Sequence, residues 1–167
     1  ADTAAKDVFA TVTGTLFGAD VDSATLTYGI SGVTAVNGVA TKAGIYGSLA
    51  VNTTTGAYTF TPNPAAINAL AGGSTASDVF TVTVTDGVVQ NPTPATLTVN
   101  VTGANDLPTI SVINAQSTNE DTPTSAIAFT VGDAETTAGS LTVTATSSNT
   151  SVVAASGISL GGSGANR

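Results

Sequence analysis

The acidic residues of this chain are few, and most of them stand in short patterns. Of its 167 residues, 11 are Asp or Glu and 3 are Lys or Arg. Calcium takes roughly six to eight oxygen ligands from carboxylates, amides and carbonyls, and it tolerates irregular geometry. Closely spaced acids put two such oxygens on one loop, so the pattern predicts calcium binding rather than catalysis. The candidate ligands are Asp20, Asp22, Asp78, Asp86, Asn105, Asp106, Glu120, Asp121, Asp133 and Glu135.

Each acid also has a plain structural interpretation. Asp is common in turns because its side chain hydrogen-bonds nearby backbone and tolerates left-handed conformations. The segment Asn105-Asp106-Leu107-Pro108 and the pair Asp133/Glu135 carry the calcium hypothesis furthest. Asp2 and Asp78 stay open between the two interpretations, and Asp7 is interpreted as structural.

Composition excludes several classes of function. The formal net charge of −8 and a pI near 4.1 disfavour nucleic acid, because phosphate binding needs many Lys and Arg side chains. Apolar runs fall short of the roughly 18 residues that span a bilayer, so no membrane insertion is expected. The chain has no Cys and no His, which leaves no thiolate site, zinc site or His-based triad. We therefore expect no enzyme.

Alternation with a period of two residues dominates the chain and predicts an all-β fold. Phe80, Val82 and Val84 alternate with threonines over residues 78–85, and residues 97–101 repeat the pattern. These two runs are expected to pair antiparallel across Asp86-Gly87 and the Pro92/Pro94 loop. Further strands are expected at 8–12, 26–30, 33–36, 45–51 and 57–61.

The expected elements group into two antiparallel β-sandwiches in tandem. Residues 1–106 supply about seven strands and one short helical turn, with Asn63 as N-cap, Pro64 at the first position and Gly72 as the stop. Residues 107–167 supply only about four strands, near 110–112, 127–131, 141–145 and 152–153. The second sandwich is therefore expected to be incomplete, with its C-terminal strands missing. A hairpin loop is expected at Gly161–Asn166.

Several motifs of the first domain resemble the VCBS or cadherin-like repeat of large secreted bacterial adhesins. The resemblance rests on Ile45–Asn52, Thr55–Pro62, Ile67–Leu70, Asp78–Gly87 and the closing Thr102–Pro108. Residues Asn119–Pro123 and Phe129–Thr136 look like a related Ig-like repeat. The resemblance implies a tandem, extracellular, calcium-stabilised spacer at the bacterial cell surface.

Cadherin-like strand order would divide the candidate ligands between domain ends. Asp78, Asn105 and Asp106 would share a junction with Asp133 and Glu135, and Asp2 could complete it. Asp86 would join Asp20 and Asp22 at the opposite end of the first domain. Glu120 and Asp121 would serve the far end of the second domain.

Three functions remain open from the sequence. The first is a calcium-stabilised spacer that gives an adhesin or surface filament rigidity and reach in adhesion or biofilm, with neighbouring repeats or subunits as partners. The second is a self-assembling filament or surface-layer subunit that completes the second domain with a strand from another chain. The third is carbohydrate binding on Tyr28, Tyr46, Tyr58 and Phe60, although alternation favours a core position for Phe60.

Overall fold

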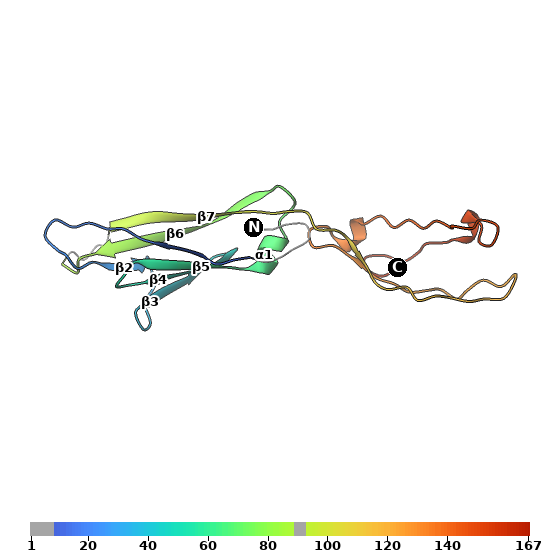
Figure 1. The fold of residues 1–167 in the computed structure, drawn as a ribbon, viewed down its shortest axis with the longest axis horizontal. Coiled ribbons are helices and arrows are strands. Elements are labelled where there is room, and N and C mark those ends of the chain that lie inside the picture. The colour runs from blue at the N-terminus through green and yellow to red at the C-terminus, as the bar shows by residue number, and fades with distance from the viewer. Residues whose placement is uncertain (1–8, 89–92) are drawn as a thin grey trace. The chain divides into compact units, whose positions relative to one another are not determined.

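The chain folds into two compact units, Ala1–Asn105 and Asp106–Arg167, called unit 1 and unit 2 below (Figure 1). The structure is a computed structural model that describes residues 9–88 and 93–167. Asp2, Asp7 and Pro92, which the sequence interpretation names, lie outside the described residues, and so does Val8, the first residue of the strand predicted at 8–12. Each unit is described by itself.

Unit 1 is a sandwich of two antiparallel sheets, as its sequence predicts. One sheet has the order β1-β5-β4-β3 and the other has the order β2-β6-β7. Figure 1 shows β6 and β7 running side by side along unit 1. The strands are β1 (Val12–Thr15), β2 (Thr27–Ile30), β3 (Val39–Ala43), β4 (Gly47–Asn52), β5 (Ala57–Pro62), β6 (Thr75–Thr85) and β7 (Thr93–Thr102).

The core of unit 1 lies between these sheets. Phe60 from β5 meets Phe80 from β6 edge to face, with ring centroids 6.2 Å apart and planes inclined by 63°. Such pairs add to the large apolar area that each ring removes from water. The other members of the buried cluster are Ile30, Ala40, Leu49, Val51 and Val82.

The predicted pairing of the two long strands is confirmed. β6 and β7 run antiparallel, with Phe80 opposite Leu97 and Thr83 opposite Pro94. Both strands are longer than expected, because the ladder continues through polar residues that alternation alone does not mark. Phe80 and Val82 are buried, while Thr81 between them is exposed.

Two strand predictions in unit 1 are wrong. Residues 33–36 form no strand: Val33 donates to the Ile30 carbonyl in a turn, and Val36 makes only an isolated bridge to Val39. The strand in this region is instead β3, where Ala40 is the one buried residue. A five-residue strand with a single small buried side chain gives little periodic signal. The first described strand begins at Val12, whereas the predicted one ended there.

The helical turn is present but shorter than predicted. Helix α1 spans Pro64–Asn68, with Asn63 at its N-cap position and Ala69, rather than Gly72, at its C-cap position. The Asn63 side chain makes no capping hydrogen bond and donates instead to the Ile45 carbonyl at 3.4 Å. Gly72 has a different reason to be glycine, since a Cβ there would crowd Asn105.

Unit 2 contains little regular structure. β8 (Thr109–Ile110) and β9 (Val131–Gly132) pair antiparallel, and Phe129 exchanges two backbone hydrogen bonds with Arg167. Two 3-10 turns follow, η1 (Ala138–Ser140) and η2 (Ala155–Gly157). The strands predicted at 141–145 and 152–153 are absent from unit 2, all of which is described. Unit 2 therefore has fewer and shorter strands than the incomplete sandwich that its sequence alternation predicts.

Candidate functional site

The best-defined acidic arrangement lies in unit 2, where β8 and β9 begin and end. Thr109 lies opposite Gly132, so the same antiparallel register places Asp106 opposite Glu135. The Asp106 backbone N–H donates to both carboxylate oxygens of Glu135, at 3.2 and 3.3 Å. Both residues are half-buried. The short ladder thus brings together two acids that are far apart in sequence.

Asp133 organises the loop that carries Glu135. Its Oδ1 accepts the backbone N–H of Thr136 at 2.7 Å and that of Glu135 at 3.2 Å. The hydrogen bond from the Thr136 backbone is the largest cause that lowers the pKa of Asp133 below its ordinary value of 3.8. Hydrogen bonds to the ionised form favour that form. Asp133 is therefore a carboxylate at neutral pH.

Asp106, Asp133 and Glu135 offer the ligand chemistry that calcium prefers. Their side chains supply only oxygen atoms as ligands, and hydrogen bonds link Glu135 both to Asp106 and to Asp133. In the described parts of the chain, however, no three Asp or Glu side chains converge into a group that could hold a metal ion. The oxygen ligands and the register that brings Asp106 and Glu135 together suit calcium, but these residues do not form a complete coordination shell without it.

Asp78 lies in a different environment from the other candidates. It is only 5% exposed, and its two oxygens accept the backbone N–H groups of Ile45 at 2.8 Å and Tyr46 at 2.9 Å. The sequence left Asp78 open between ligand and structural residue. In the structure its carboxylate is engaged by protein donors. Asn105, expected near it, lies in close contact with Gly72.

The acids expected at the opposite end of unit 1 lie in separate turns. Asp20 Oδ1 accepts the backbone N–H groups of Asp22 and Ser23, both at 2.8 Å. Asp86 Oδ1 accepts the Val88 N–H at 3.0 Å. Each of these two acids thus shapes its own loop. Whether Asp20, Asp22 and Asp86 bind calcium together stays a prediction.

The pair Glu120 and Asp121 forms an exposed turn in unit 2. Asp121 has a positive φ of 56°, and the turn is held by a Thr122 hydroxyl that donates to the Glu120 carbonyl at 3.2 Å. Asp is among the residues that adopt this conformation most readily. The turn interpretation accounts for Asp121, and the metal role of the pair stays a prediction.

The comparison with known families agrees with the architecture of unit 1. The family model for the bacterial cadherin-like domain matches residues 1–103. The chain belongs to this family. Bacterial cadherin-like domains are typically structural or adhesive, and they usually belong to extracellular or surface proteins. No curated protein and no solved structure matches the chain.

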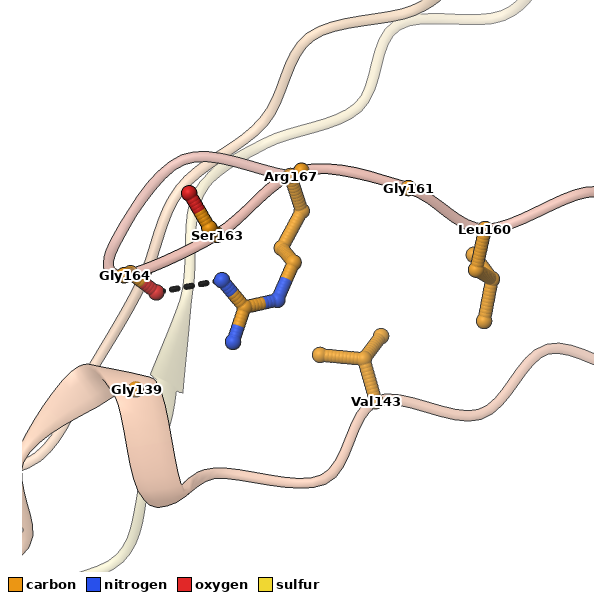
Figure 2. A pocket seen from close by; sticks show the side chains of 8 residues that line it. Gly139, Val143, Leu160, Gly161, Ser163, Gly164 and Arg167 are labelled. Atoms are coloured by element: carbon orange, nitrogen blue, oxygen red, sulfur yellow. Dashed lines mark hydrogen bonds between the residues drawn. The ribbon is translucent and has the colours of Figure 1, made fainter.

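A hollow in unit 2 of this cadherin-like chain is lined by glycines, two apolar side chains and Arg167, whose guanidinium is held by backbone carbonyls (Figure 2). The Arg167 guanidinium donates to the backbone carbonyls of Gly164 and Ala138, the latter at 3.1 Å. The lining offers one hydroxyl and no acid or His that would activate it. Its residues are Gly139, Val143, Leu160, Gly161, Gly162, Ser163, Gly164 and Arg167. The expected hairpin loop is confirmed by the bridge between Ser163 and Asn166.

Three of the four aromatic residues proposed for carbohydrate binding, Tyr28, Tyr58 and Phe60, pack in or against the core of unit 1. Phe60 is 1% exposed, as alternation predicts, and Tyr28 and Tyr58 pack against the buried cluster. These three side chains therefore do not form the exposed strip that stacking on a sugar needs. Over the described residues, no helix is long and apolar enough to cross a membrane.

Proposed function

We propose that this chain is a calcium-stabilised structural repeat of an extracellular bacterial adhesin or surface filament. Its membership of the bacterial cadherin-like family supports the adhesin class, and the sandwich of unit 1 supplies a rigid element. The partners would be neighbouring repeats of the same protein or neighbouring subunits. The contribution of the domain would be rigidity and reach, not chemistry.

The observation that carries the calcium part is the contact between Asp106 and Glu135. A carboxylate lies against the backbone of a second acid, and Asp133 stands two residues away on the same loop. Carboxylates carried on neighbouring segments repel each other unless a cation or hydrogen bonds offset their charge. Bound calcium would supply that neutralisation. Asp106, Asp133 and Glu135 would hold it, and it would draw their side chains into one shell.

Calcium would matter most where the hydrophobic core is small. Val131 is the single buried hydrophobic residue of unit 2, which is described throughout. Small units with little apolar burial often depend on a metal or another crosslink. A cation that ties the loop after β9 to the segment before β8 would replace part of the missing core.

The test is thermal unfolding of the full chain with calcium and in excess chelator. The calcium concentration is about 1 mM, at which extracellular calcium modules bind. At a tenfold excess over Kd, binding stabilises the folded state by about 1.4 kcal/mol. For a unit of this size, that free energy raises the Tm by roughly 5–10 °C. Calorimetry and amide spectra would show whether unit 2 carries the shift.

The matched variants are Asp133→Asn and Glu135→Gln, which keep side-chain shape and remove charge. Both should lose most of the calcium-dependent rise in Tm. Magnesium serves as the ion control, because it demands a smaller, more regular shell. An equal Tm in calcium and in chelator would refute the calcium part of the proposal and leave the family assignment intact.

A further inference from the structure

The carboxylate of Asp78 joins two parts of unit 1 that belong to different sheets. Asp78 lies on β6, in the sheet β2-β6-β7, and it has the same inward orientation as Phe80 and Val82. Its hydrogen bonds reach the three-residue turn between β3 and β4, in the other sheet. It is the one buried charged or polar side chain among the described residues. An ionisable group thus occupies a core position.

Two glycines allow the turn to approach this carboxylate. A Cβ at Gly44 would overlap the Asp78 carboxylate, and a Cβ at Gly47 would overlap the Phe60 ring. The turn is closed by the Gly44 N–H, which donates to the Gly47 carbonyl at 2.7 Å. Glycine at these two positions therefore lets the turn lie directly against the side chains of Asp78 and Phe60.

The polar groups of the turn and of Asp78 satisfy each other. The Ile45 and Tyr46 N–H groups donate to Asp78, while the Tyr46 carbonyl accepts the Asn63 N–H at 2.7 Å. A buried carboxylate is costly unless it is hydrogen-bonded, and so is a buried N–H without an acceptor. Loss of the two N–H donors would leave the buried Asp78 carboxylate unsatisfied. The contact is therefore specific rather than incidental.

We propose that Asp78 is a metal-independent clamp that locks the β3–β4 turn onto β6 and holds the two sheets of unit 1 together at this end. The clamp goes beyond the calcium proposal and does not depend on it. The sequence left Asp78 open between a calcium ligand and a structural residue, and the clamp gives it the structural role. The groups that Asp78 binds are two backbone N–H groups of the same chain.

The first test uses Asp78→Asn in the full chain, in excess chelator. One amide oxygen can accept one of the two N–H groups, but the side-chain NH2 then faces the other donor. We expect a fall in Tm of about 8 °C or more, given the strength of hydrogen bonds to charged groups. Hydrogen exchange at the Ile45 and Tyr46 amides should accelerate by about tenfold or more.

Asp20→Asn is the matched control. Asp20 also accepts two backbone N–H groups, but both come from its own exposed loop and both reach the same oxygen. Asparagine retains that oxygen, so we expect little change in Tm in chelator. Gly44→Ala attacks the clamp from the opposite side and keeps the charge of Asp78. It should reproduce the exchange pattern of Asp78→Asn.

The wild-type protein provides a test that needs no variant to fold. The Ile45 and Tyr46 amides should exchange far more slowly than the amide of Thr54, which donates to the Asn52 side chain within an exposed turn, although Ile45 itself is 68% exposed. Rapid exchange at both amides would overturn the clamp. So would a Tm loss in Asp78→Asn that appears with calcium and disappears in chelator, because that result would make Asp78 a calcium ligand. A calcium-insensitive chain with the expected Asp78 effects would refute only the calcium proposal.

Discussion

Unit 1 and unit 2 have similar alternating sequences but very different amounts of structure. Unit 1 closes two sheets over a cluster of seven buried residues, whereas unit 2 has two strands of two residues each and one buried hydrophobic residue. In unit 2, Ile110 and Val112 are 59% and 85% exposed, although they alternate as strand residues should. Alternation therefore marks which face of a strand is apolar, but a facing layer is needed to bury that face.

The difference also explains where calcium would have the larger effect. Unit 1 has an internal polar contact, Asp78 to the β3–β4 turn, in addition to its core. Unit 2 has the Asp106–Glu135 contact and the Asp133 turn in place of a core. If the calcium proposal is right, unit 2 should respond to chelator more strongly than unit 1.

The largest expected effect is the loss of the central ring of unit 1. Phe60→Ala should destabilise unit 1 by about 3–5 kcal/mol, because it removes a buried ring and leaves a cavity beside Phe80. Phe17→Ala is the control: Phe17 is 93% exposed, and its loss should change stability by no more than about 0.5 kcal/mol. Denaturant unfolding measures both. Equal effects would contradict the core as described.

A smaller effect is expected in unit 2. Val131→Ala removes about two methylene equivalents from a side chain that is 7% exposed, which corresponds to about 1.5 kcal/mol. Val112→Ala, at an exposed position, is the control. Residue-resolved hydrogen exchange should show loss of protection in unit 2 and none in unit 1. Loss of protection in β6 and β7 would show that the two units do not unfold independently.

The smallest expected effect is the pH dependence of the Asp133 turn. The folded pKa of Asp133 is lowered, so its stabilising contribution is complete well above the ordinary value of 3.8 and is lost as the pH falls through the folded pKa. The Tm difference between wild type and Asp133→Asn, in chelator, should therefore shrink below about pH 4. A difference that stays constant down to about pH 2 would contradict this role.

Much of unit 1 could be predicted from its sequence. The long runs ending in Thr85 and Thr102 pair as expected, and Phe60 is in the core. β3 was missed because its single buried residue is Ala40, and the helix was extended too far because Gly72 looks like a helix stop. The signal for β3 is weak, and the signal of Gly72 is ambiguous. The same local signal serves several purposes, and only contacts between segments distinguish them.

The sequence predicts the residue types of the candidate site and how its acids are grouped, but not the contacts between them. The resemblance to cadherin-like repeats places Asp106 in one group with Asp133 and Glu135. The direct contact between Asp106 and Glu135 follows only from the register of β8 and β9. The role of Asp78 had a visible signal. It occupies the inward position of the alternation that contains Phe80 and Val82, where a carboxylate needs internal donors.

The sequence by itself determined the all-β class, the exclusion of His- and Cys-based chemistry, and the oxygen-rich character of the loops. Those properties depend on composition and on the two-residue period, which are local. The tertiary structure alone decided which acids have protein partners and which repeat has a core. Burial and hydrogen bonding depend on segments that are distant in sequence. The turn at Ile45 and Tyr46 supplies the donors for Asp78, and the packing of one sheet against the other buries Phe60 and Phe80.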